Sequence, residues 1–183
     1  MADLFGGSFG GSDDEGSAAL SADEIFLLET VFEGAAVLGA ELDARYRVLA
    51  VTLEPTPERY VWGVEQDRRV QVLFSPVSTM LVALLRTADD GRRELLTFDH
   101  DQLPDLVAAL GGPSVHGPVF GRPEPRPGEW APRYSLEGRS SAPDGTAATL
   151  RIELDTDDLE FGLFARFDEV EVRDPSGAAL RLP

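Results

Sequence analysis

The side chains best suited to chemistry lie in two short segments, and the first places a histidine between two carboxylates. Asp99, His100 and Asp101 form a grouping that can orient a general base or bind a divalent ion. Adjacent residues of an extended segment point to opposite sides, so these three side chains do not readily converge on one atom. We therefore expect one aspartate to cap the helix that follows and the histidine to be exposed.

The second segment is an acidic cluster made of Asp155, Asp157, Asp158 and Glu160, which raises the question of calcium binding. An EF-hand loop places oxygen ligands at its first, third and fifth positions and glycine at its sixth. Counted from Asp155, the fifth position is Leu159 and the sixth is Glu160, so the spacing does not fit. An acidic turn between two strands is the better interpretation, and we predict no metal site here.

The amino-acid composition excludes whole classes of catalysis. The chain has 183 residues and no cysteine, all 16 of its basic residues are arginine, and its two histidines are His100 and His116. Lysine Schiff bases, P-loop phosphate binding, thiol catalysis and thiolate zinc sites are therefore impossible. No cofactor site is predicted from these residues. We expect a protein without catalytic activity, with a carboxylate- or metal-dependent hydrolase using Asp99, Asp101 or residues 155–160 as one alternative.

A second alternative function is the binding of a small ligand by a β-rich domain. Trp62 and Trp130 are the two tryptophans of the chain, and each could line a pocket in a curved sheet. Large aromatic residues more often serve as core or rim packing, and this reading is the one we expect to hold.

Charge favours a basic protein partner. The formal net charge is −17, and residues 1–43 hold ten acidic residues and no basic one. Such a surface disfavours direct binding to nucleic acid or to an anionic membrane. The acidic N-terminus lacks the basic region of a secretory signal, and the longest uncharged run, 70–85, is too short to span a membrane. We expect a cytoplasmic location, and the oligomeric state stays open.

The first 20 residues are predicted to be a flexible acidic tail. They are rich in glycine and serine and contain few large apolar side chains, so they cannot bury enough surface to offset the entropy of ordering. A tandem FGGS places Phe5 and Phe9 on this tail, followed by Asp13, Asp14 and Glu15. We expect these five residues to contact a basic partner, the phenylalanines as apolar anchors and the carboxylates by long-range attraction.

A helix is predicted over 22–33, because Ser21 and Glu24 have the spacing of a capping box. The large apolar residues that recur at helical spacing are Ile25, Leu28 and Phe32, with Phe26, Leu27 and Val31 widening the stripe. Gly34 and Gly39 weaken a continuation, so the segment up to Leu42 is expected to be one kinked helix or a helix and a turn.

The rest of the chain is predicted to be mainly strands. The strands expected from alternating or continuous apolar residues are 45–53, 60–64, 70–74, 93–98, 134–136, 150–154, 161–167 and 170–172. Residues 77–87 fit a strand or a short helix, and a hairpin is expected between this segment and 93–98. A second helix is expected over 101–110, ended by Gly111 and Gly112.

Together these elements predict an α+β fold, with a largely antiparallel, curved β-sheet and two helices packed on one face. Residues 21–183 are expected to form a single domain, with 122–133 as a proline-rich connector within it. The predicted function is that of a non-catalytic protein-interaction module, adaptor or chaperone-like, whose acidic N-terminal segment recruits a basic partner.

Overall fold

The computed structural model describes residues 21–63, 67–87, 90–112, 114–115, 134–135, 146–153 and 159–181. Its elements in chain order are α1 (Ala22–Phe32), β1 (Ala36–Asp43), β2 (Val48–Glu54), β3 (Val70–Ser75), β4 (Thr79–Thr87), β5 (Arg93–Phe98), a 3-10 turn η1 (His100–Gln102), α2 (Leu103–Ala109), β6 (Ser114–Val115), β7 (Tyr134–Ser135), β8 (Thr146–Glu153), β9 (Leu159–Phe167) and β10 (Glu169–Arg173). Neither helix has the length and apolar character of a membrane span among these residues.

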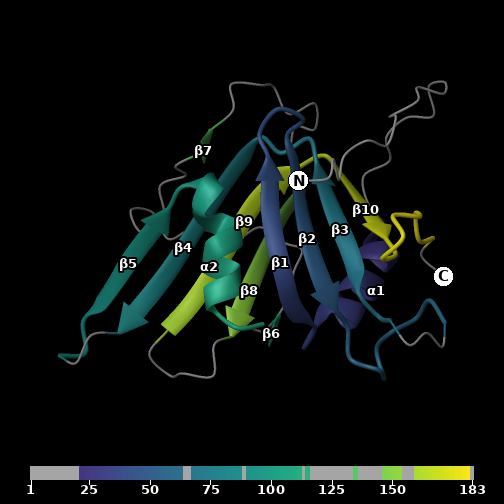
Figure 1. Cartoon of the computed structure of the whole chain (residues 1–183), viewed down its shortest axis with the longest axis horizontal. Helices are drawn as coiled ribbons and strands as arrows, with labels where there is room; N and C mark the ends of the chain where they lie inside the picture. The colour runs from purple at the N-terminus through teal and green to yellow at the C-terminus, as the bar shows by residue number, and fades with distance from the viewer. Residues whose placement is uncertain are drawn as a thin grey trace.

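The strands form one antiparallel sheet, which curls (Figure 1). Its order is β10-β3-β2-β1-β6-β8-β9-β4-β5, and β7 pairs with β4. The short strand β6 joins the two halves of the sheet, because it pairs with β1 on one side and with β8 on the other. The predicted α+β class with a largely antiparallel, curved sheet is confirmed.

Both helices contribute to the same core, together with strands from both halves of the sheet. In α1 the buried residues are Leu28, Val31 and Phe32, and in α2 they are Leu103 and Val107. Every buried residue of the described part of the chain is apolar. Burial of each large apolar side chain stabilises a fold by about 1.5–3 kcal/mol. The apolar contacts in this shared core therefore contribute most to holding the two helices against the sheet.

The chain passes from one half of the sheet to the other at Asp168, between β9 and β10. Residues of β9 pair with β4, whereas residues of β10 pair with β3. The large apolar residues change here from odd positions, such as Phe161, Leu163 and Phe167, to even ones, Val170 and Val172, and the chain bends at Asp168.

The expectation for residues 34–42 was wrong, because this segment is strand β1 and not a continued helix. Gly34 ends α1 with a φ of 75°, a left-handed conformation that favours glycine. Its N–H donates to the carbonyl of Val115, which ties the end of the helix to β6. The strand then pairs with β2 along its whole length, with a register shift between Val37 and Gly39. Long-range pairing therefore decides the structure of a segment whose local pattern was ambiguous.

Two further strand predictions need correction. The predicted strand at 45–53 begins only at Val48, because Asp43 accepts hydrogen bonds from the backbone N–H groups of Arg45 and Tyr46 and turns the chain. Residues 60–63 do not form a strand.

Several further local predictions agree with the structure. Residues 79–87 are a strand, which settles the ambiguity at 77–87, and the strand forms the expected hairpin with β5. Gly111 and Gly112 follow α2 with positive φ, as expected for a helix stop. The predicted tail 1–20 and connector 122–133 lie outside the described residues.

Candidate interaction surface

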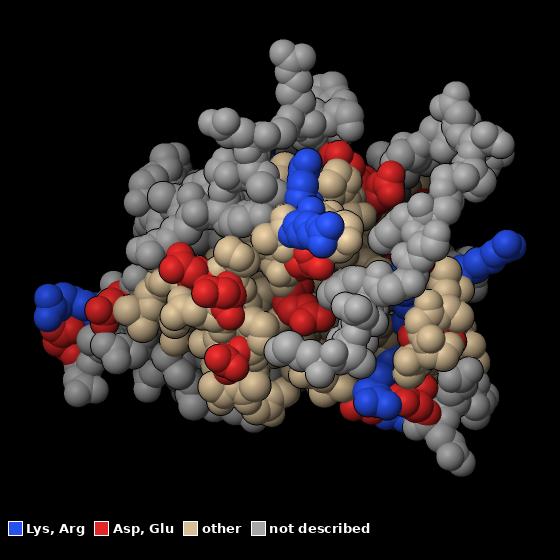
Figure 2. All heavy atoms as spheres, turned by 45° about the horizontal axis from the view of Figure 1, so that its top comes forward, with Lys and Arg blue, Asp and Glu red and all other residues tan. Residues whose placement is uncertain are grey.

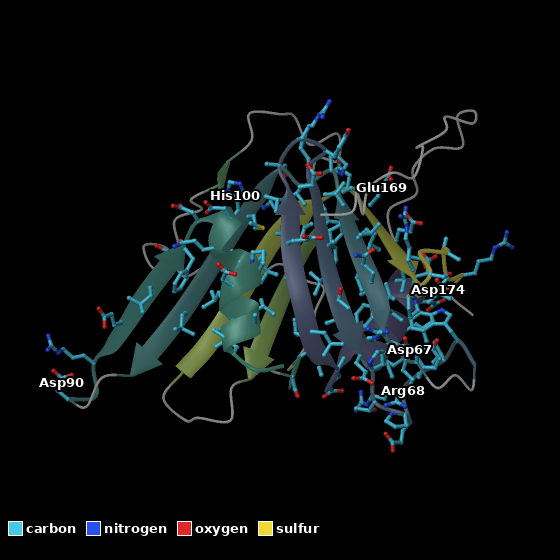
Figure 3. The ribbon with its side chains drawn as sticks, viewed as in Figure 1. Asp67, Arg68, Asp90, His100, Glu169 and Asp174 are labelled. Carbon is cyan, nitrogen blue, oxygen red and sulfur yellow. The ribbon has the colours of Figure 1, made fainter. Side chains whose placement is uncertain are left out.

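The Asp99-His100-Asp101 segment lies between β5 and α2, where the chain enters the 3-10 turn η1. Asp99 is extended and precedes η1, and its N–H donates to the Oε1 of Gln102 at 2.9 Å. Both aspartates are exposed. His100 is half-buried, so the expectation that it would be exposed was wrong. Figure 3 shows His100 close to one end of α2. No group of three or more histidine, aspartate or glutamate side chains that could hold a metal ion occurs among the residues described.

Trp62 is used to hold the C-terminal segment. Its Nε1 donates to the carbonyl oxygen of Arg181 at 3.0 Å, and its ring lies edge-on to that of Tyr60 at a centroid distance of 5.7 Å. Trp62 is half-buried and packs against the core. The indole N–H is the one polar group of the Trp62 side chain, and it already donates to the carbonyl of Arg181. This arrangement favours a role of Trp62 in packing over a role in binding a small ligand. Trp130 and residues 155–158 lie outside the described part of the chain.

Helix α1 begins with the predicted capping box. The N–H of Glu24 donates to the Oγ of Ser21 at 3.2 Å, while the N–H and hydroxyl of Ser21 donate to the Oε2 of Glu24 at 2.8 and 2.7 Å. The hydrogen bonds from the backbone and side chain of Ser21 hold the pKa of Glu24 below its ordinary value. The helix start is therefore fixed by residues close in sequence, and its orientation by the buried side chains on its other face.

The outward side of α1 carries an aromatic residue among polar ones, and we call Asp23, Phe26, Thr30 and Glu33 the α1 surface. All four are exposed, and the side chain of Phe26 is 72% accessible. The apolar stripe predicted for this helix includes Phe26, and for this residue the prediction was wrong. The signal that could have found it is the spacing, since Phe26 follows Asp23 by three residues and precedes Thr30 by four, on the polar side of the helix.

One end of the α1 surface is neutralised and the other is not. Arg59 lies beside the last turn of the helix, where its Nη1 donates to Glu33 Oε2 at 2.7 Å and to the carbonyl of Thr30 at 2.9 Å. At the first turn, Asp23 is part of none of the ion pairs described. The surface therefore has a negative end at Asp23, with Phe26 between that end and Arg59.

A second acidic surface covers the neighbouring elements β1 and α2, and we call Glu41, Asp101 and Asp105 the β1–α2 surface. Figure 2 shows acidic side chains over α2 and the adjoining end of β1. Five arginines of the described residues form ion pairs, with Glu33, Glu54, Asp67, Asp90 and Glu171. Asp23 of the α1 surface and the three carboxylates of the β1–α2 surface take part in none of the ion pairs of the described residues.

The ion pair of Asp67 and Arg69 illustrates what pairing does to an exposed carboxylate. Arg69 Nη2 lies 2.6 Å from Asp67 Oδ2, and the hydrogen bonds from Arg69 lower the pKa of Asp67 to about 2. Figure 3 shows Asp67 on the same side of the molecule as Asp174, away from His100. The charge of Asp67 is therefore balanced by its neighbour Arg69, unlike that of Asp23 in the α1 surface or those of the β1–α2 surface.

The structure describes only residues 21–43 of the acidic segment 1–43. Phe5, Phe9, Asp13, Asp14 and Glu15 lie outside the described residues, so their predicted contacts stay predictions. The part of residues 1–43 that is described folds into α1 and β1 and carries the exposed Phe26, which the sequence analysis did not single out. Comparison with known proteins finds no matching family model, no similar curated protein and no similar solved structure, so an argument for function depends on these surfaces.

Proposed function

We propose that this protein is a non-catalytic interaction module, adaptor or chaperone-like, whose acidic N-terminal segment recruits a basic protein partner. The observation that carries the proposal is the exposure of Phe26, a large aromatic side chain that is 72% accessible on a helix that buries Leu28, Val31 and Phe32 on its other side. Aromatic residues with such exposure are common anchors of protein interfaces.

The charge around Phe26 indicates what kind of partner fits. Asp23 lies one turn away on the same side, and residues 1–43 contain no basic residue. Partner arginines or lysines near Asp23 would gain attraction, and an apolar partner side chain would cover Phe26. Acidic segments also speed the encounter with a basic partner, an effect that salt weakens.

A model peptide tests this proposal. The probe is a fluorescent amphipathic peptide with arginine and leucine on one helical face, and the readout is the anisotropy when full-length protein is added. We expect Phe26→Ser to weaken binding about tenfold, because an aromatic anchor is lost. The matched control is Tyr46→Ser, which removes another exposed aromatic ring, 54% accessible in the β1–β2 turn, and should leave binding unchanged. Equal binding by the wild-type protein and Phe26→Ser would contradict the role of the α1 surface.

Two variations separate charge from apolar anchoring and the helix from the tail. A peptide with glutamate in place of arginine should not bind, and added salt should weaken binding of the arginine peptide. Replacement of Phe5 and Phe9 by serine in the full-length chain tests the predicted tail anchors. If this double variant binds as the wild type does, the tail phenylalanines have no part in recruitment and the α1 surface acts alone.

A further inference from the structure

The α1 surface differs in charge from one end of the helix to the other. Asp23 lies in the first turn and takes part in none of the ion pairs of the described residues. Phe26 follows about one turn later, with its side chain 72% accessible. Arg59 lies at the other end, where it pairs with Glu33. A partner lying along the helix therefore meets a carboxylate, an aromatic ring and a guanidinium in this order.

Arg59 is bonded on one side only, so it can still bind a partner carboxylate. Its Nη1 donates to Glu33 Oε2 at 2.7 Å and to the carbonyl of Thr30 at 2.9 Å. Within the part of the chain that the structure describes, its Nε and Nη2 donate to no acceptor. The Arg59 side chain is 36% accessible, and the N–H groups of a guanidinium form a planar fork that suits carboxylates. A basic partner residue finds no unpaired carboxylate at this end, because Arg59 already neutralises Glu33.

The spacing along α1 determines where the charges of a helical partner must lie. With a rise of about 1.5 Å per residue, Asp23 lies about 4.5 Å before Phe26 along the axis, and Glu33 lies about 10 Å after it. A helical partner laid along α1 would need a basic residue about one turn from the apolar residue that covers Phe26. Its acidic residue would lie about two turns from that apolar residue, on the other side. Because the two distances differ, a partner with the two charges exchanged does not regain the fit by binding in the reverse direction.

We propose that the α1 surface selects a helical partner segment with a basic residue near Asp23, an apolar residue over Phe26 and an acidic residue near Arg59. This inference rests on the proposed function and specifies the charge pattern of the partner segment that the α1 surface accepts. A segment with basic residues at both ends fits less well, because the second one meets the guanidinium of Arg59 and like charges repel.

Two fluorescent helical peptides of identical composition test the proposal, with the full-length protein and anisotropy as the readout. The first peptide has arginine one turn before a central leucine and glutamate two turns after it, and the second has these two charged residues exchanged. We expect the wild-type protein to bind the first peptide about three- to tenfold more tightly, because attractive contacts at two exposed sites replace repulsive or misplaced ones. This comparison needs no substitution in the protein.

Arg59→Gln tests which protein group contacts the acidic end of the partner. A third peptide with arginine at both charged positions should bind this variant more tightly than the wild type, because Glu33 is then unpaired. The first peptide should bind the variant more weakly, since its glutamate then lies near Glu33 without Arg59 between them. The matched control is Arg69→Gln, which removes the arginine of another exposed ion pair, that with Asp67, and should change neither result.

The possible outcomes separate this inference from the proposed function. Equal binding of the first and second peptides by the wild-type protein would overturn the charge order and leave the proposed function standing. Binding of none of the three peptides would overturn both. If Arg59→Gln and Arg69→Gln have the same effect, or if the doubly basic peptide gains nothing from Arg59→Gln, the selection does not come from Arg59 and the inference is overturned.

Discussion

Replacement of Phe32 by alanine should destabilise the fold strongly, whereas the same replacement of Phe26 should not. The two side chains belong to the same helix, six residues apart, but Phe32 is 0% accessible in the core and Phe26 is 72% accessible. Truncation of a buried phenylalanine removes its apolar burial and leaves a cavity, which costs about 3–5 kcal/mol. At an exposed position the change is within about 0.5 kcal/mol, and the higher helix propensity of alanine offsets part of it.

Urea unfolding and thermal unfolding of the two full-length variants, each followed by far-ultraviolet circular dichroism, measure this difference. For a chain of this size each kcal/mol shifts Tm by about 2–4 °C, so Phe32→Ala should lower Tm by roughly 6–20 °C. Phe26→Ala should unfold close to the wild type and with the same dependence on urea. Equal destabilisation by both substitutions would show that Phe26 is buried in solution, and this result would refute the reasoning behind the α1 surface as well.

Three further outcomes test the local structure. Ser21→Ala should cost about 1 kcal/mol through loss of the cap, and an NMR titration should find the pKa of Glu24 raised toward its ordinary value. In the wild type this lowered pKa means that the carboxylate stabilises the fold above its unfolded-state pKa and that the contribution is lost as pH falls through the folded-state pKa. Gly34→Ala should lower the free energy of unfolding by about 1 kcal/mol because the φ of Gly34 is 75°, although a Cβ at this position meets only ordinary contacts. Gly39→Ala should leave the free energy of unfolding unchanged or raise it, because Gly39 has an ordinary φ and open space around it. Urea unfolding of the two variants measures both effects. Trp62→Phe should remove its indole hydrogen bond, and hydrogen exchange should then be faster in the C-terminal segment that this bond holds.

The surface residues show how far local sequence reasoning reaches toward a site. The acidic character of residues 1–43 is a property of composition, and it is visible without any structure. The exposure of Phe26 is different, because a phenylalanine beside Leu27 and Leu28 matches a wide apolar stripe as well as it matches a polar face. Only the position of the helix on the sheet selects which side of that stripe is buried.

Residues close in the chain determined the features that depend on nearby atoms alone. The capping box of Ser21 and Glu24, the β4–β5 hairpin and the glycine stop after α2 were all predicted, since each is formed by side chains or backbone groups a few residues apart. Alternating apolar residues likewise predicted most strands of an antiparallel sheet.

Tertiary structure decided the features for which the local pattern allowed more than one answer. Residues 36–43 became a strand because β2 and β6 supply partners for their backbone groups, although the same segment could have continued as a helix. The order of the strands, which places β10 beside β3 and leaves β5 at the edge, joins residues far apart in sequence. Such contacts depend on which apolar faces meet when the chain closes into one core, and no short stretch of sequence contains that information.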